Sequence, residues 1–290
     1  DWEQFNGPGS LHVSTQSVFA LHPLCQTYAT RDEFLRDVPR LIIEQNIYGV
    51  DIDPPAAQIA SLALWLRAQR AWHSASLKIQ NRPAISGGNI FAAIAPPVQE
   101  AQLQQFVADM DRFDAQLLVK TLHLLKQVPE LGVLLQVEKE IPRLVSEVFG
   151  SHGSLFEASD SERWKAAEAR LRTTLVDFAN ATRSTYQGRL FVHDALQGLE
   201  LIDLCGEVFD VVVMNPPFGL PTKDCQSQIA ASYPDSYVDV YACFVSRAAE
   251  LCRGWVGAIT SRSLLITKKL ERLRANLLLP KFDVLLDLGW

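Results

Sequence analysis

Apolar runs that end in polar residues recur along the chain, and they predict the strands of a parallel sheet. The clearest run is Phe209 to Met214, whose largely β-branched side chains predict a strand buried on both faces. Similar runs predict further strands near residues 47–52, 190–193, 255–260 and 282–288. Strands that alternate with helical patterns indicate an α/β fold.

The N-terminal part, residues 1–97, combines helical and strand patterns. Residues 31–45 place their apolar side chains on one helical face. After the strand at 47–52, Asp53 fits the N-cap and Pro54 the first position of an apolar helix. Two glycines near the end of this part are predicted to form a turn before a short strand or loop, because their spacing does not match a phosphate-binding loop.

Residues 98–185 have a different pattern from the segments around them. Apolar side chains recur there at helical spacing, in stretches near 103–124, 131–149 and 159–181. We therefore predict a helical insertion that divides the sheet-forming core into two parts, 1–97 and 186–290.

Composition sets limits on the partners of the chain. Its net charge of −6 provides no general attraction for nucleic acid, so such a contact needs a local patch or another protein. The Lys and Arg residues between 262 and 274 form the one locally basic segment, which is either a solvated helix face or a phosphate-binding surface.

The cysteines and histidines predict neither disulfides nor a metal site. The five cysteines are scattered without a CxxC pair, which is typical of reduced thiols in a cytoplasmic protein. The six histidines are scattered too. Neither a membrane-spanning run nor a signal peptide is expected.

Candidate chemistry begins directly after the strand at 209–214, with Asn215-Pro216-Pro217-Phe218. The prolines end the strand and stiffen a turn at its carboxyl end, where α/β sheets bind ligands. The Asn215 side-chain oxygen and the Pro216 carbonyl are two acceptors suited to the N–H bonds of a nucleobase amine. Phe218 offers a ring for base stacking, worth about 1–3 kcal/mol. The alternative is a strand that ends in a polar turn with a packed phenylalanine.

Two other predicted strands end in an acid. Asp51 lies at the tip of the strand at 47–52, where nucleotide-binding folds place an acid that accepts hydrogen bonds from ribose hydroxyls. The alternative is a solvated strand-end acid. Asp194 ends the strand at 190–193, and its carboxylate is suited to the exocyclic amine of an adenine ring.

With these motifs, the chain resembles the amino-methyltransferases that act on adenine in DNA. The likeness is closest to the PglX-like methyltransferases of BREX phage-defence systems, which are related to fused restriction-modification enzymes. It is carried by the strand with Asn215-Pro216-Pro217-Phe218, by Gly49-Val50-Asp51-Ile52-Asp53-Pro54 and by His193-Asp194-Ala195-Leu196. Supporting segments are residues 58–69, 233–236, 239–244 and 257–262.

The resemblance implies a Rossmann-like class I core that uses S-adenosylmethionine to methylate the N6 amine of adenine in DNA, in phage defence or restriction-modification. The implied cofactor contacts are Asp51 on the ribose, Ile52 packed on the adenine ring and Asp194 on the adenine amine. The implied partners are DNA with a flipped adenine and other proteins of the defence system, and no metal is required. The implied catalytic residues are Asn215, Pro216, Pro217 and Phe218.

One departure affects these expectations. The family opens with a strand and a glycine-rich turn that cradles the methionine end of the cofactor, and no such turn occurs upstream of Ile47. The chain is therefore expected to be a segment of a longer protein, to lack the first strand and to bind the cofactor weakly by itself. Residues 11–20 alternate enough to supply a substitute strand. Two alternatives stay open: a non-catalytic scaffold, and an amino-methyltransferase for guanine in RNA or glutamine in protein.

Overall fold

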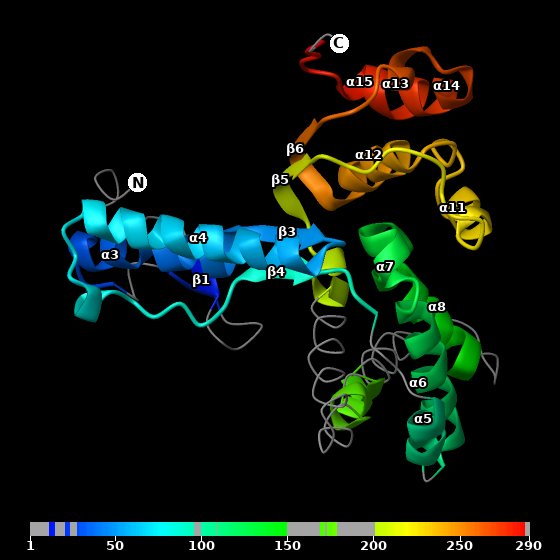
Figure 1. Cartoon of the computed structure of the whole chain (residues 1–290), viewed down its shortest axis with the longest axis horizontal. Coiled ribbons are helices and arrows are strands. Elements are labelled where there is room, and N and C mark those ends of the chain that lie inside the picture. The colour runs from blue at the N-terminus through cyan, green and yellow to red at the C-terminus, as the bar shows by residue number, and fades with distance from the viewer. Residues whose placement is uncertain are drawn as a thin grey trace. The chain divides into compact units, whose positions relative to one another are not determined.

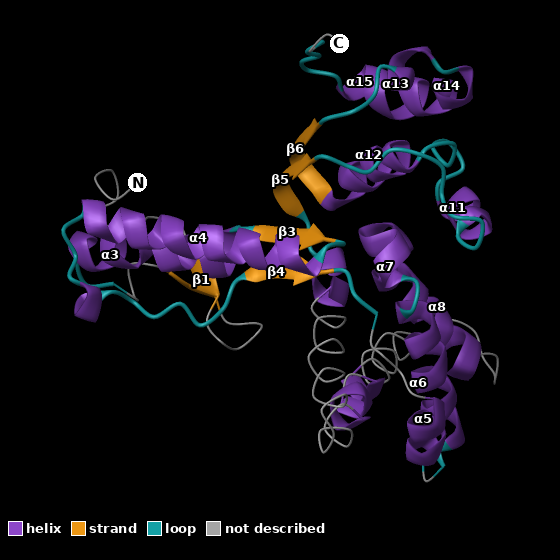
Figure 2. Ribbon diagram, in the orientation of Figure 1, coloured by secondary structure: helices purple, strands orange, loops and turns teal. Residues whose placement is uncertain are grey.

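A computed structural model shows a mixed α/β chain made of helices and short strands (Figures 1 and 2). The chain divides into two compact units, Asp1–Ala92 and Ala93–Trp290. Within the described residues, each unit contains one pair of parallel strands joined through helical segments. The structure describes residues 12–14, 21–23, 28–95, 100–108, 110–149, 169–171, 173–178 and 201–287.

The first unit is built around one β-α-β arrangement. Its elements are β1 (His12–Ser14), β2 (Leu21–Pro23), α3 (Arg31–Leu41), η1 (Ile42–Asn46), β3 (Tyr48–Asp51), α4 (Pro54–Ser74), η2 (Ile79–Asn81) and β4 (Asn89–Ala92). The predicted helix near residues 31–45 is confirmed as α3 with its continuation η1. β3 and β4 pair in parallel, with Val50 opposite Phe91, and α4 packs against both strands.

A small core fixes α4 in the first unit. Trp72 is 1% exposed and packs with Ile43 and Ala68. Its indole N–H donates to the carbonyl oxygen of Arg36 at 2.7 Å, so the ring is buried with its one polar group paired. This contact holds the helix that starts beside the tip of β3.

Of the stretch 11–20, which is predicted to supply a substitute strand, the structure describes residues 12–14, and their pairing differs from that prediction. Residues 12–14 form β1, which pairs antiparallel with β2 in a sheet of their own. The hydrogen-bonded neighbour of β3 in this unit is β4. A short strand can make its backbone hydrogen bonds with a second strand that follows closely in the chain. β1 does so with β2 and therefore does not pair with β3.

The second unit begins with helices. These are α5 (Glu100–Val107), α6 (Arg112–Leu125), α7 (Val128–Leu131), η3 (Gly132–Leu135) and α8 (Val137–Phe149). Between residues 100 and 149 the described residues form helices and turns and contain no strand. Of the third predicted stretch, 159–181, the described residues 169–171 and 173–178 are helical. The boundaries of the insertion at 98 and 185 stay a prediction.

The second strand pair follows the predicted strand at 209–214, which is confirmed as β5 (Phe209–Met214). It is followed by α11 (Gln226–Ser232), α12 (Val240–Leu251) and β6 (Cys252–Ala258). β5 and β6 pair in parallel, with Val212 opposite Val256, and α12 packs against both strands. β6 starts three residues before the predicted 255, because α12 passes into the strand without a loop.

Gly254 is required where β5 and β6 approach each other. The register of the pair shifts between Phe209 and Val211, which places an extra residue on β6. A Cβ atom at Gly254 would lie 2.2 Å from the carbonyl oxygen of Asp210, a distance that backbone atoms cannot accommodate. The glycine therefore permits the irregularity that sets the register of the motif-bearing strand.

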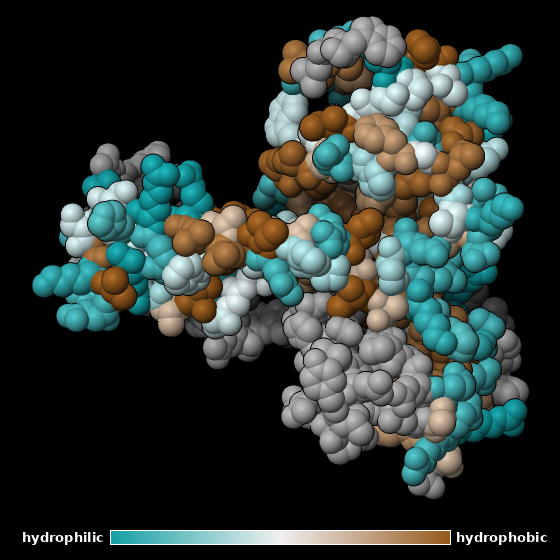
Figure 3. All heavy atoms as spheres, viewed as in Figure 1, coloured by the Kyte–Doolittle hydropathy of each residue, from teal (hydrophilic) through white to brown (hydrophobic). Residues whose placement is uncertain are grey.

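The expectation that residues 209–214 are buried on both faces is wrong for this structure. Val211 and Val213 are 57% and 81% exposed, and Trp255 and Ile259 of the same face are 64% and 55% exposed. Hydrophobic side chains accordingly gather at the surface over β5 and β6 (Figure 3). An apolar run indicates only that a segment suits a buried strand. In this structure α12 covers one side of the β5–β6 pair, and the other side stays exposed.

The C-terminal segment also differs from the sequence prediction. It forms short helical turns: α13 (Ser263–Ile266), η5 (Lys268–Leu270), α14 (Glu271–Leu273), η6 (Arg274–Leu278) and α15 (Leu279–Lys281). The strand predicted at 282–288 is not formed over the described residues 282–287, which are exposed and have no strand partner in the described chain. A strand needs a neighbour to receive its backbone hydrogen bonds. Among the described helices, none is both long and apolar enough to cross a bilayer.

Candidate functional site

The turn after β5 presents an amide and an aromatic ring at the carboxyl end of the strand. Asn215 is exposed and makes no hydrogen bond with any described residue. Pro216 is buried, whereas the ring of Phe218 is 55% exposed. The next residue, Gly219, has a φ of +120°, which a residue with a side chain rarely adopts. The buried Pro216 therefore fixes the turn, while the two candidate ligand-binding side chains, Asn215 and Phe218, stay accessible to solvent.

Asp239 holds this turn to the start of α12. Its Oδ1 accepts a hydrogen bond from the Gly219 N–H at 2.9 Å and one from the Tyr241 N–H at 3.4 Å. The Gly219 carbonyl in return accepts from the Val240 N–H at 2.8 Å. One carboxylate thus caps the helix and also fixes the residue that follows Phe218.

Tyr241 packs beneath the exposed ring. The ring centroids of Phe218 and Tyr241 are 5.5 Å apart with an interplanar angle of 48°. Tyr241 is fully buried, and its hydroxyl shares a hydrogen bond of 2.7 Å with Ser263 Oγ. Burial raises the pKa of Tyr241, so the phenol stays neutral. Tyr241, held in place by Ser263, therefore gives the Phe218 ring a neutral aromatic support.

An open depression lies at the carboxyl ends of β5 and β6. Its volume is about 310 Å³, and the amide of Asn215 is the polar side chain in a lining otherwise made of apolar residues and glycine. The Ile259 N–H donates to the Met214 carbonyl at 3.1 Å, which extends the pairing of the strands to the rim. The lining residues are Val213, Met214, Asn215, Gly257, Ala258 and Ile259. Parallel sheets bind ligands at this end.

The loop that follows the turn is held by the α7–η3 segment, residues 128–135. Glu130 Oε2 accepts hydrogen bonds from the Thr222 hydroxyl at 2.6 Å and from the Cys225 thiol at 3.0 Å. The buried Tyr233 hydroxyl donates to the Leu134 carbonyl at 3.2 Å. The residues on both sides of α11 are thus attached to helices from a distant part of the chain.

Arg247 attaches α12 to the same helices. Its side chain is 2% exposed, and its guanidinium lies 2.8 Å from a carboxylate oxygen of Glu138 and 3.1 Å from one of Glu250. Its Nε–H donates to the Val133 carbonyl at 3.1 Å. Burial lowers the pKa of Arg247, but the facing Glu138 carboxylate and its other neighbours raise it by more, so the group stays charged.

The predicted cofactor residues of the first unit lie together at the tip of β3. Asp51 is the last residue of the strand, and Ile52 beside it is 58% exposed. Asp51 Oδ1 accepts a hydrogen bond from the Asp53 N–H at 2.9 Å, so the carboxylate turns toward the start of α4. Asp194 lies outside the described residues.

The predicted cap of α4 is confirmed in position. Asp53 is the N-cap and prolines occupy the first two helical positions, but the Asp53 side chain accepts no hydrogen bond from the first turn. Proline has no N–H, so Pro54 and Pro55 remove donors on which a capping carboxylate depends.

Asp239 and Tyr241 are the residues of this region that sequence reasoning did not select. An aspartate before an apolar helix predicts an N-cap. The sequence carries no local signal that the same carboxylate also binds Gly219, since that contact joins residues far apart in the chain.

The comparisons with known proteins concern nearly the whole chain. A family described as Eco57I restriction-modification methylase matches residues 45–288. An adenine-specific methyltransferase BrxX of Escherichia coli O9:H4 (strain HS) is 24% identical over 93% of this chain and 22% of its own length. An adenine-specific methyltransferase PglX of Lacticaseibacillus casei (strain Zhang) is 25% identical over 93% of this chain and 20% of its own length. The chain therefore spans about a fifth of these curated relatives.

Proposed function

The chain belongs to the Eco57I restriction-modification methylase family, and from that premise we propose that it forms the part of a methyltransferase that receives the target amine. The proposed reaction is methyl transfer from S-adenosylmethionine to the N6 amine of adenine in DNA, in phage defence. The observation that carries the proposal is the exposed Asn215 amide, which has no hydrogen-bond partner among the described residues, near the exposed Phe218 ring at the carboxyl end of β5. The names of the relatives support adenine as the acceptor.

The residues of the turn have distinct roles in this proposal. The Asn215 side-chain oxygen and the Pro216 carbonyl accept hydrogen bonds from the two N–H groups of the amine. This favours a tetrahedral nitrogen, whose lone pair is free to attack the methyl group. Phe218, supported by Tyr241, stacks on the flipped base, and Pro217 keeps the turn stiff. Stacking of about 1–3 kcal/mol offsets much of the few kcal/mol that flipping costs. Because the reaction is a displacement, positioning supplies most of the acceleration.

S-adenosylmethionine, when bound, supplies an activated methyl group on a positively charged sulfonium. Asp51 and Ile52 fit its adenosine half, since an exposed carboxylate and an exposed apolar side chain lie next to each other at a strand tip. We assign the ribose hydroxyls to Asp51, the adenine ring to Ile52 and the adenine amine to Asp194.

The fold that we propose is a Rossmann-like core. The two parallel β-α-β arrangements support it, because they are the repeating elements of such folds. Residues 1–97 and 186–290 are the proposed core parts and residues 98–185 the proposed helical insertion. Other proteins of the defence system are the proposed partners.

The test supplies the purified full-length protein, which contains this chain, with S-adenosylmethionine carrying a labelled methyl group. DNA duplex, structured RNA and a glutamine-containing peptide are offered separately. We expect label in DNA, recovered as N6-methyladenine after digestion to nucleosides. Label confined to RNA or to the peptide would replace the proposed acceptor, and the absence of label in all three substrates would favour a scaffolding role.

The Asp239 contact predicts that the turn depends on the cap of α12. Asp239→Ala removes the acceptor for the Gly219 N–H, so we expect about 1 kcal/mol lower stability together with slower methyl transfer. The matched control is Asp111→Ala on α6, where the carboxylate caps Phe113 and Asp114 but does not contact the turn. Urea unfolding and initial rates measure both effects. Equal slowing by the two variants would show that the rate follows general stability.

A further inference from the structure

The C-terminal helical turns concentrate positive charge in a chain that is negative overall. Between residues 262 and 281 there are six basic residues and one acidic residue, Glu271, whereas the whole chain carries −6. The basic residues are Arg262, Lys268, Lys269, Arg272, Arg274 and Lys281. A polyanion would bind to this local excess of positive charge, because the net negative charge of the chain provides no long-range attraction for it.

Two of these cations have structural partners. The Arg274 guanidinium donates to the carbonyls of Leu264 at 2.9 Å and Thr267 at 2.8 Å. Arg262 lies 2.8 Å from the carboxylate of Asp287. Both side chains therefore contribute to the local fold of the segment, and neither is a good candidate for an external ligand.

Lys268, Lys269 and Arg272 are different, and we call them the cationic triplet. All three side chains are exposed, and none of them makes a hydrogen bond or ion pair with any residue that the structure describes. They occupy η5 and α14, within five consecutive residues of the chain. Their charges are available to solvent and lie close together.

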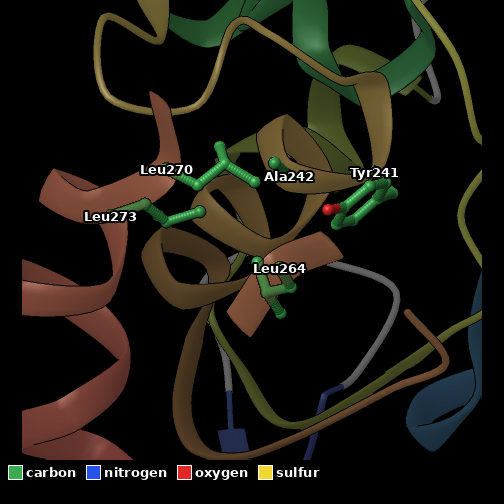
Figure 4. Packing of buried hydrophobic residues seen from close by; sticks show 5 residues of the cluster. All are labelled: Tyr241, Ala242, Leu264, Leu270 and Leu273. Atoms are coloured by element: carbon green, nitrogen blue, oxygen red, sulfur yellow. The ribbon is translucent and has the colours of Figure 1, made fainter. Parts of the chain in front are cut away.

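The backbone that carries the triplet is packed onto the helix that supports the turn. Leu264, Leu270 and Leu273 form a buried cluster with Tyr241 and Ala242 of α12 (Figure 4). Tyr241 in turn contacts the Phe218 ring. The chain of contacts from Phe218 through Tyr241 to the leucines places the triplet at a fixed position relative to Asn215.

We propose that the cationic triplet binds the phosphate backbone of DNA next to the base that the turn at 215–218 receives. The proposal rests on the proposed function for the identity of the polyanion. Flipping a base costs a few kcal/mol, and backbone contacts at a fixed distance from the pocket hold the strand while the base is extruded. A triplet mounted on the support of Phe218 meets this requirement.

The test compares two triple variants of equal charge change by fluorescence anisotropy with a labelled DNA duplex. One is Lys268→Gln/Lys269→Gln/Arg272→Gln. The control is Arg67→Gln/Arg70→Gln/Lys78→Gln, which removes three exposed cations from the first unit. Each phosphate contact contributes about 0.9 to the slope of log affinity against log salt concentration. We expect the triplet variant to reduce that slope by about 2.7, and the control to leave it nearly unchanged.

Three results would overturn the proposal: equal slopes for the two variants, no salt-dependent DNA binding by the unmodified protein, or tighter binding of the unmodified protein to RNA or polyglutamate than to DNA. Methyl transfer at saturating DNA separates this inference from the proposed function. Salt-sensitive binding through the triplet without methyl transfer would refute the function alone. Methyl transfer with unchanged binding in the triplet variant would refute the inference alone.

Discussion

In the full-length protein, Asn215→Ala is expected to slow methyl transfer to DNA by about 10²–10³-fold, the usual effect of removing one group that stabilises developing charge. In the proposed reaction the side-chain oxygen accepts an N–H of the amine as the nitrogen becomes tetrahedral, so its contribution grows as the methyl group is transferred. Affinity for S-adenosylmethionine should be nearly unchanged, because the proposed cofactor residues are Asp51, Ile52 and Asp194. Single-turnover rates and calorimetric titration of the cofactor measure the two effects.

The structure makes this substitution a clean one. Asn215 is exposed and has no hydrogen-bond partner in the described chain, so its loss should change stability by at most about 0.5 kcal/mol. Asn276→Ala is the matched control, since Asn276 is an exposed asparagine of the same unit whose amide donates to the Asp235 carboxylate at 3.3 Å. We expect Asn276→Ala to leave the rate of methyl transfer unchanged. A parallel fall in cofactor affinity for Asn215→Ala would assign the residue to the cofactor site instead.

The parts of the fold that sequence reasoning predicted correctly depend on local patterns. β5 has the predicted bounds, because a β-branched run followed by two prolines marks both ends of a strand. Helix α3 and the N-cap position at Asp53 follow from helical periodicity and from the proline at the first turn. Each of these signals lies within about one helical turn of the residues that it organises.

The parts that were missed depend on contacts between distant residues. Asp239 binds Gly219 across twenty positions, and Tyr233 binds Leu134 across ninety-nine. The exposure of Val213 depends on which elements cover the sheet, and the coil at 282–287 depends on whether a neighbouring strand is present. A local pattern records what a segment can form, whereas its neighbours decide what it does form.

Arg247 makes further contacts between distant residues, and Arg247→Met is expected to lower the free energy of unfolding by about 3–5 kcal/mol. The substitution leaves the Glu138 carboxylate without its cation. Glu138 Oε1 faces Arg247 at 2.8 Å, and the buried Oε2 accepts no hydrogen bond from the described residues. Since domains are stable by only about 5–15 kcal/mol, such a loss would populate the unfolded state under mild denaturant. Urea unfolding followed by circular dichroism measures it.

Two further variants separate a buried charge from a lost contact. Arg247→Met/Glu138→Leu removes both charges and should recover part of the stability, because an apolar pair needs no desolvated partner. Arg253→Met breaks the exposed pair with Asp210, and its unfolding midpoint should match that of the unmodified protein. If the double variant were as unstable as Arg247→Met, the hydrogen bond to the Val133 carbonyl, not the ion pair, would be what joins α12 to the helical segment. If Arg247→Met unfolded at the same urea concentration as Arg253→Met, the buried guanidinium would contribute no more than a surface charge.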